Sequence, residues 1–543
     1  MKRITLLLFQ FVFLTSIFYA QTYNGNPYRK AIRPTKNVIL MIPDGTSIGV
    51  VSAARWYQIY NKLGGENLSI DPYICGTVKT FCSNAPIGDS APATSAFTTG
   101  MISQAGNVAI YPQADPKQDL MDIDPSMAYQ PLTTILEAAR IEQNKATGLV
   151  VTVEFPHATP ADCSAHHYDR DRYDILATQM ANQNLDVMFG GGTKLINSDI
   201  MQHLNSQGIT YYANDIDAFR KHKDGKIWSL WCDMDMPYGI DRDSTQIPSL
   251  QEMTIKALDV LSQNDNGFFL MVEGSKVDWV AHANDAVGCI TEFLEFDKAV
   301  GAAIDFARKD GNTTVVILPD HGNSGFSIGR WGLKNYAEQG LEKLFGNVSK
   351  YKRTAEGLEK ILLQNKPEDY RSLIKQYTDI DITDQEQKKL EESVNFKAEN
   401  YMKVSDSKNM TANLVEIMNK HTYFGFTTGG HTGEEVFLAV YHPQGDIPVG
   451  MNTNIEINHY LSDALGLKKR LPELTKEIFA KHSDVFAGLQ YSIDHTNKDF
   501  PILIVKKGKN KLEIPAFKSV AYLNNKAFDI GSVVVYIDKT DTF

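Results

Sequence analysis

The sequence predicts an α/β fold, in which a large central and mostly parallel sheet is flanked by helices. Several apolar segments rich in β-branched residues show no polar alternation, which is typical of strands buried on both faces. Segments with helical periodicity separate them along the chain. Each apolar segment also lies beside an Asp, Glu or His residue, so the predicted strands share a polar end.

These polar ends indicate where the chemistry lies. Four apolar runs are Asn37–Pro43, Gly148–Val153, Phe268–Val272 and Thr313–Pro319, and they lead into Asp44, Glu154, Glu273 and Asp320. A fifth run, Val436–Tyr441, follows a glycine-rich segment that contains His431. Because ligands bind outside the carboxyl ends of strands in open α/β sheets, we expect these side chains to meet at one rim. Together they predict a site for several metal ions, although any one of them alone could belong to an ordinary turn.

The segment Gly88–Ala96 predicts a reactive serine at the start of a helix. Asp89 stands directly before Ser90, and small residues follow at helical spacing. Pro92 is tolerated only in a first helical turn, so Ser90 is expected at or beside the helix N-terminus. The unpaired N–H groups and the helix dipole there favour an alkoxide or a bound phosphate. Serine is also common at helix starts for structural reasons alone.

The spacing of two Asp–His pairs is typical of metal ligands. Asp278 and His282 are four residues apart, which places both side chains on one face of a helix. There they could bind one cation or form an ordinary ion pair. Asp320 and His321 are adjacent, so they can share a metal only from a loop or a strand end, and the preceding Pro319 favours that arrangement.

In combination, these motifs resemble those of the bacterial alkaline phosphatases. The motifs are G-D-S-A-P-A-T-S-A around Ser90, V-E-G-S-K-V-D-W-V-A-H around Asp278, P-D-H-G at Asp320 and G-G-H-T-G-E-E at His431, in the order of the family. The resemblance runs from about Asn37 to about Tyr441. It implies an enzyme that hydrolyses phosphate monoesters to inorganic phosphate and contains two Zn²⁺ ions and one Mg²⁺ ion.

The resemblance also implies the ligands of each metal. The first zinc corresponds to a site formed by Asp278, His282 and His431. The second zinc corresponds to a site formed by Asp44, Asp320 and His321, with Ser90 beside it. The magnesium-type site shares Asp44 and is completed by Thr159 and Glu273. This division agrees with ligand chemistry, because imidazole and carboxylate suit zinc whereas an all-oxygen set suits magnesium.

The resemblance assigns the reacting groups as well. Ser90 corresponds to the nucleophile that becomes phosphoserine. Arg170 corresponds to the side chain that binds the phosphoryl group. Its planar guanidinium can donate hydrogen bonds to two phosphoryl oxygens at once. Arg172 lies close by in the sequence, so it is an alternative for that role, and either arginine could instead be a surface residue.

Two positions depart from the best-known pattern of the family. His157 stands where many bacterial members have an acidic residue near the third metal, and it could be a direct ligand or lie just behind the ligands. Trp279 stands where many members have a lysine that contacts phosphate through water. It could shape the mouth of the pocket or simply pack against its neighbours. Both changes bear on the identity of the third metal.

The chain divides into five segments by composition. They are a secretory signal peptide at 1–20, a first part of the α/β core at 21–330, a helical insertion at 331–423, a second part of the core at 424–498 and a β-rich extension at 499–543. The insertion could cover the rim, form a homodimer contact or be a solvated pair of helices. In the extension we expect strands at Pro501–Val505, Ala521–Leu523 and Ser532–Ile537, with a turn at Lys506–Lys511. Cleavage near Ala20 would place the enzyme in the periplasm or outside the cell.

Charge and cysteine content exclude some classes of function. The net charge of −11 over 543 residues, without a basic run, argues against nucleic-acid binding and against association with anionic membranes. No segment after the signal peptide approaches the length of a membrane span. The five cysteines are an odd number, so at least one thiol is unpaired in a monomer. Cys75 and Cys82 could form a bridge only if the segment between them folds back.

Two alternatives to a phosphomonoesterase remain at the level of sequence. A relative that acts on phosphodiesters, phosphonates or sulfate esters would share the two-metal core. The oxygen ligands Thr159 and Glu273 favour the monoesterase, and the segment after Ser90 lacks the arginine of a sulfatase motif. A binding protein descended from an enzyme would have no need to keep Ser90, Arg170 and the complete ligand set.

Overall fold

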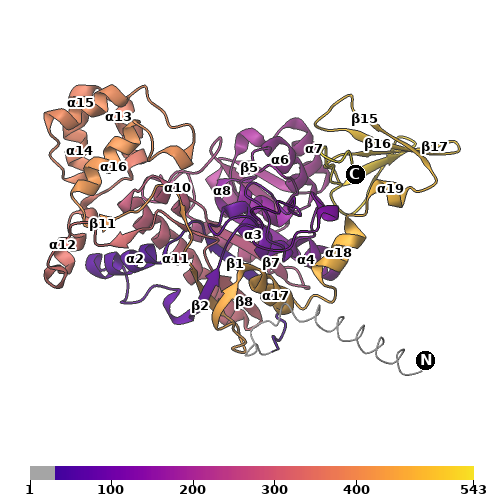
Figure 1. The fold of residues 1–543 in the computed structure, drawn as a ribbon, viewed down its shortest axis with the longest axis horizontal. Coiled ribbons are helices and arrows are strands. Elements are labelled where there is room, and N and C mark those ends of the chain that lie inside the picture. The colour runs from indigo at the N-terminus through magenta and orange to yellow at the C-terminus, as the bar shows by residue number, and fades with distance from the viewer. Residues whose placement is uncertain (1–30) are drawn as a thin grey trace, which may run out of the picture.

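A ten-stranded, mostly parallel sheet forms the centre of the protein (Figure 1). The computed structural model describes residues 31–543, so the predicted signal peptide lies outside the described residues. In order across the sheet, the strands are β14 (Gly450–Thr453), β2 (Ile74–Lys79), β13 (Val436–Tyr441), β8 (Thr313–Ile317), β1 (Asn37–Pro43), β7 (Phe268–Gly274), β3 (Ala146–Glu154), β4 (Val187–Gly191), β6 (Ile227–Trp231) and β5 (Thr210–Ala213). Strand β13 runs antiparallel to its neighbours. The predicted fold class is confirmed.

Helices cover both faces of this sheet. Those of one face are α2 (Ile48–Asn61), α9 (Leu250–Leu261), α10 (Lys276–His282) and α11 (Ala286–Asp310). Those of the other face are α3 (Ser90–Thr99), α4 (Ile135–Gln143), α5 (Ala158–Ser164), α6 (Tyr173–Asn182), α7 (Ser198–Ser206) and α17 (Asn454–Leu465). Strand β1 serves both cores, because Ile39 and Met41 face the first layer while Val38 and Leu40 face the second. Its seven residues are all buried, which explains their continuous apolar sequence.

The segment between β8 and β13 is largely helical. Its helices are α12 (Leu341–Phe345), α13 (Ala355–Leu363), α14 (Tyr370–Thr378), α15 (Asp384–Ser393) and α16 (Met410–Lys420), and they form a lobe at one end of the molecule (Figure 1). Two small antiparallel pairs connect this lobe to the core. They are β10 (Ser327–Ile328) with β11 (Phe424–Gly425), and β9 (Gly322–Asn323) with β12 (His431–Thr432). The second pair brings His431 beside the segment that follows β8.

A five-stranded antiparallel sheet lies at the opposite end of the molecule. Its strands are β15 (Gln490–Asp494), β16 (Ile502–Lys507), β17 (Asn510–Pro515), β18 (Val520–Leu523) and β19 (Lys526–Asp529). Along the chain, α18 (Leu471–Ile478) and α19 (His482–Val485) connect the core to this sheet. The predicted strand at Ser532–Ile537 is wrong. The side chains Val533, Val535 and Ile537 are buried with Ile110 and Ile175 of the core, so this apolar run seals the junction instead of extending the sheet.

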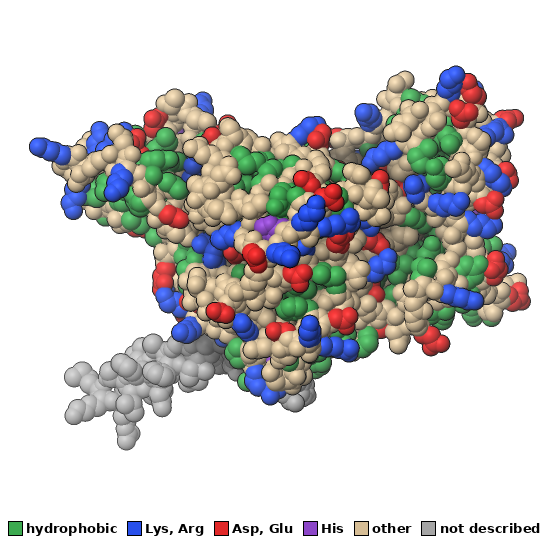
Figure 2. All heavy atoms as spheres, turned by 180° about the vertical axis from the view of Figure 1, so that it is seen from behind, with side chains coloured by type: hydrophobic (Ala, Val, Ile, Leu, Met, Phe, Trp, Pro, Cys, Tyr) green, Lys and Arg blue, Asp and Glu red, His purple; other side chains and the backbone are tan. Residues whose placement is uncertain are grey.

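Three further features bear on the sequence expectations. All five cysteines are free thiols. Within residues 31–543, no helix combines the length and the apolarity that crossing a bilayer requires. Acidic and basic side chains are interspersed over the face seen in Figure 2, without a continuous basic stripe on that face.

Gly49 in α2 provides a test of how tightly this helix packs near the sheet. A β-carbon at Gly49 would lie 2.0 Å from the backbone carbonyl oxygen of Phe326. Helix propensity alone predicts that Gly49→Ala stabilises the protein by about 1 kcal/mol. Because the contact is with backbone, we expect a net loss of about 1–3 kcal/mol in the free energy of unfolding instead. Gly65→Ala is the control, since nothing lies within 4 Å of a β-carbon there. An unchanged or raised melting temperature for Gly49→Ala would contradict this packing.

Candidate metal centre and nucleophile

The candidate site lies at the carboxyl ends of four neighbouring strands. Strands β8, β1, β7 and β3 are adjacent and parallel, so their polar ends lie side by side. In that order they bring in Asp320 with His321, then Asp44, then Glu273, then His157 and Thr159. Distant parts of the sequence are therefore joined at one rim by the strand order alone.

Three groups of side chains at this rim are arranged so that each could hold a metal ion. In each group the ligand atoms lie within 4.8 Å of one another. The groups are Asp278 with His282 and His431, Asp44 with Asp320 and His321, and Asp44 with His157 and Glu273. Asp44 thus belongs to two groups, the sharing that the family resemblance implies. The third group includes His157, and Thr159 follows it two residues later in the first turn of α5.

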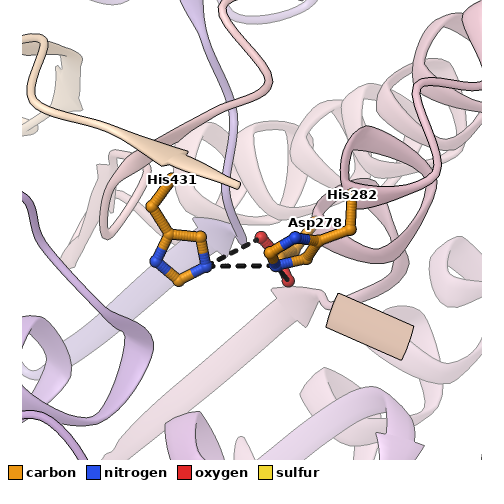
Figure 3. A group of neighbouring side chains, drawn as sticks. All are labelled: Asp278, His282 and His431. Carbon is orange, nitrogen blue, oxygen red and sulfur yellow. Dashed lines mark hydrogen bonds and ion pairs between the residues drawn. The ribbon is translucent and has the colours of Figure 1, made fainter. Parts of the chain in front are cut away.

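The first group combines two elements from different parts of the chain. Asp278 and His282 project from α10, and His431 projects from β12, so that the three side chains point toward one another (Figure 3). The Nε2 atom of His282 lies 3.3 Å from Asp278 Oδ2 and 3.1 Å from His431 Nε2. Asn323 donates a 2.7 Å hydrogen bond to Asp278 Oδ1 and thereby fixes the carboxylate.

Backbone carbonyls orient the three histidines of the first two groups. The Nδ1 atom of each histidine lies close to a glycine carbonyl oxygen. The distances are 2.8 Å from His282 to Gly429, 2.9 Å from His431 to Gly88 and 3.1 Å from His321 to Gly322. When each Nδ1–H donates to its carbonyl, each Nε2 keeps its lone pair for the centre of the group. This is the arrangement by which proteins fix the tautomer of a metal-binding histidine.

The second group depends on a glycine. Asp320 accepts a 3.0 Å hydrogen bond from the backbone N–H of Gly45, directly after Asp44. Gly45 has a φ of +57°, and a β-carbon there would lie 2.2 Å from Asp278 Oδ1. A side chain at this position would therefore be strained and would also displace a residue of the first group.

Ser90 lies against the second group. It is the first residue of α3, and Asp89 precedes it with extended backbone. Its Oγ lies 3.3 Å from His321 Nε2, and the side chain is buried. The hydroxyl therefore lies at the positive end of α3 and beside one residue of the second group, a position that favours a bound anion.

The third group has polar atoms suited to a cation. Among the described residues, buried atoms without a hydrogen-bond partner include both carboxylate oxygens of Asp44 and of Glu273, Oγ1 of Thr159 and Nδ1 of His157. Buried polar atoms are almost always partnered in native proteins, so this concentration fits the binding of a metal ion by this donor set.

Burial and mutual repulsion shape the charges at the rim. Burial, followed by the charges of Asp320 and Asp278, raises the pKa of Asp44 well above its usual value. Burial, with the charge of Asp320, likewise raises the pKa of Glu273. Burial opposes ionisation of Asp278 too, but interactions with His282 and His431 outweigh it and lower the pKa of Asp278. The second and third groups therefore hold carboxylates that lack sufficient compensating positive charge from the protein.

Arg170 faces the site, whereas Arg172 does not. Arg170 forms a 2.9 Å ion pair with Asp89, and its Nη2 atom lies 3.3 Å from His157 Nε2. Arg172 instead pairs with Asp174 and Asp499 at the protein surface. Of the two arginines that the sequence left as alternatives, only Arg170 is placed to meet an anion beside Ser90.

Trp279 has a partner that sequence reasoning did not identify. Its ring stacks on Tyr401 at 4.4 Å between centroids, and the Lys276 ammonium lies 4.0 Å from the Trp279 ring. Tyr401 belongs to the helical insertion and lies within a segment without a recognisable motif, so no pattern in the sequence connects it with the rim. Asn323 was missed as well, although its position two residues after His321 could have suggested a role.

The sheet and this rim define an α/β enzyme with a serine beside a candidate metal centre. The family model for alkaline phosphatase matches residues 35–467. Alkaline phosphatase 3 of Bacillus subtilis is 34% identical over 445 residues, which cover 79% of this chain and 89% of that protein. Alkaline phosphatase 4 of the same organism is 32% identical, and the match covers 78% of this chain and 87% of that protein. The chain belongs to the alkaline phosphatase family and is a phosphomonoester hydrolase.

Solved structures agree with this assignment. The cold-active alkaline phosphatase of a psychrophilic Shewanella species has a TM-score of 0.67 at 26% identity, covering 79% of this chain and 99% of that one. The Thermus thermophilus alkaline phosphatase has a TM-score of 0.69 at 22% identity, covering 83% and 96%, and shows the same fold. The family match ends at residue 467, so the five-stranded sheet lies beyond it.

The raised carboxylate pKa values predict how the stability of metal-free protein depends on pH. Asp44 and Glu273 keep protons in the folded protein that the unfolded chain releases, so stability falls as the pH rises from about 7 toward the pKa of Glu273 at about 8. Burial lowers the pKa of His157 to about 3 and that of His431 to about 4, so both are neutral in the folded protein and mostly neutral in the unfolded chain over this range. Melting temperatures after chelation measure this slope.

Glu273→Gln tests the origin of that slope. The amide cannot ionise, so the chelated variant is expected to lose less stability between about pH 7 and about pH 8 than the chelated parent. Adding zinc and magnesium to the parent should also reduce its slope, because bound cations favour the ionised carboxylates. A melting temperature of the chelated parent that is constant or rises over this range would contradict the assigned charge balance.

Proposed function

We propose that the enzyme is secreted and hydrolyses phosphate monoesters through a phosphoserine intermediate on Ser90. In this proposal Asp278, His282 and His431 hold one zinc ion, and Asp44, Asp320 and His321 hold a second. Asp44, Thr159 and Glu273 hold a magnesium-type ion, with His157 as a further ligand or neighbour. The observation that carries the proposal is the placement of the Ser90 hydroxyl at the start of α3, 3.3 Å from His321.

Each residue then has a defined part in the reaction. When bound, the metal ions supply positive charge that lowers the pKa of the Ser90 hydroxyl and stabilises the phosphoryl oxygens. The Ser90 oxygen loses its proton and attacks phosphorus, forming an O–P bond as the bond to the alcohol oxygen breaks, and the leaving alcohol oxygen takes up a proton. Water then attacks the phosphoserine, inorganic phosphate leaves, and the Ser90 oxygen regains a proton. Arg170 binds phosphoryl oxygens throughout, with its orientation held by Asp89.

Ser90→Ala tests the role of the nucleophile. We expect kcat/KM on an aryl phosphate monoester to fall at least about a thousandfold, because the hydroxyl that accepts the phosphoryl group is removed. The zinc content should remain that of the parent, since the metal ligands are retained. The parent should also prefer the monoester to the matching diester, lose activity on chelation and regain it with zinc.

The outcomes separate the three candidate functions. Undiminished activity of Ser90→Ala would contradict the phosphoserine route. A preference of the parent for the diester would favour the related diester hydrolases. Absence of turnover on both esters despite bound zinc would favour a binding protein.

Secretion has a test of its own. The positively charged start and apolar core of residues 1–20 are typical of a signal peptide. When the full chain is expressed in a bacterium, we expect N-terminal sequencing of the exported protein to begin near Gln21. Recovery of the active enzyme from the cytoplasm with Met1 still at its N-terminus would contradict this part of the proposal.

A further inference from the structure

Tyr401 brings the helical insertion into contact with the candidate site. It begins a short 3₁₀ turn, Tyr401–Lys403, in the segment between α15 and α16. Its hydroxyl lies 3.2 Å from His157 Nε2 and 3.4 Å from Arg170 Nη2. One phenol therefore touches both a residue of the third group and the proposed phosphate-binding arginine.

The ring of Tyr401 is held in place from one side by α10. The ring stacks on Trp279 with an angle of 13° between the two ring planes, and this contact fixes the direction in which the hydroxyl points. Trp279 is in turn fixed by Lys276, which is buried and pairs with Asp235 at 2.5 Å. Tyr401 therefore rests on the same helix that carries Asp278 and His282.

A second contact fixes the segment that carries Tyr401. The Ser405 hydroxyl oxygen lies 1.8 Å from where a β-carbon of Gly429 would be, so a side chain at position 429 would displace Ser405. The Gly429 carbonyl accepts the hydrogen bond that orients His282. The insertion therefore packs against both α10 and the segment that contains Gly429, and Tyr401 forms part of the lining of the candidate site.

The hydrogen-bonding capacity of these groups determines the direction of the contacts. Arg170 can only donate, and a neutral His157 whose Nδ1 keeps its lone pair for the third group carries its proton on Nε2. The Tyr401 hydroxyl oxygen has two lone pairs, so it can accept one hydrogen bond from Arg170 Nη2 and one from His157 Nε2. Tyr401 then fixes one edge of the guanidinium, and the ion pair with Asp89 fixes the other.

We propose that Tyr401 is a positioning residue that the helical insertion supplies to aim Arg170 at the phosphoryl group. This inference rests on the proposed function in one respect, namely that Arg170 binds phosphate. Tyr401 acts through Arg170 and does not itself need to touch the phosphoryl group. Its removal should therefore weaken the binding of phosphate more than it slows the chemical step.

Tyr401→Phe isolates the hydroxyl, because the ring and its stacking on Trp279 are retained. In the zinc- and magnesium-loaded enzyme, we expect the inhibition constant of inorganic phosphate and the KM of a monoester to rise about three- to tenfold. We expect kcat to change less than about twofold. Tyr336→Phe is the matched control, since it removes the hydroxyl of an exposed tyrosine in the same insertion and should leave both constants unchanged.

A double-mutant cycle with Arg170→Ala shows whether the effect passes through the arginine. Arg170→Ala should weaken phosphate inhibition strongly, and adding Tyr401→Phe to it should cause little further loss. Parental phosphate affinity in Tyr401→Phe would overturn the inference, as would a loss that adds in full to that of Arg170→Ala. Undiminished phosphate affinity in Arg170→Ala would overturn it as well, and would separately remove Arg170 from the proposed function. Ser90→Ala tests the remainder of that function independently.

Discussion

The structure depends on the accommodation of four buried carboxylates at one end of a hydrophobic sheet. Asp44, Glu273, Asp278 and Asp320 are all buried at the rim. Burying a charge is costly unless it is paired, and only Asp278 receives enough positive charge from histidines for its pKa to be lowered. The others repel one another, so bound cations would stabilise this end of the protein as well as provide its chemistry.

The surrounding fold makes this concentration of charge possible. The order of β8, β1 and β7 places Asp320, Asp44 and Glu273 side by side, and buried strands lie behind them. Gly45 allows Asp44 and Asp278 to approach, and Gly429 admits the insertion segment beside His282. The helical lobe is therefore part of the site, because it delivers Tyr401 to Arg170 and Trp279.

Sequence reasoning succeeded where the physical signal is local. Buried parallel strands produce continuous apolar runs, and helical spacing relates Asp278 to His282, so both could be predicted without coordinates. Tyr401 could not, because its role arises from a tertiary contact across the insertion. The apolar run at Ser532–Ile537 misled the strand prediction for a similar reason, since its side chains are buried against core residues rather than in a sheet. Arg170 and Arg172 became distinguishable only when their partners were located.

The metal content of Asp44→Asn tests the central claim most directly, because Asp44 is shared by two of the three ligand groups. Equilibrium dialysis followed by elemental analysis would count the zinc and magnesium ions retained by the folded variant and by the parent. The account predicts that Asp44→Asn retains the ion held by Asp278, His282 and His431 and loses affinity for the other two. Parental metal content in Asp44→Asn, or loss of the ion at Asp278 alone, would contradict the shared carboxylate as the link between the groups.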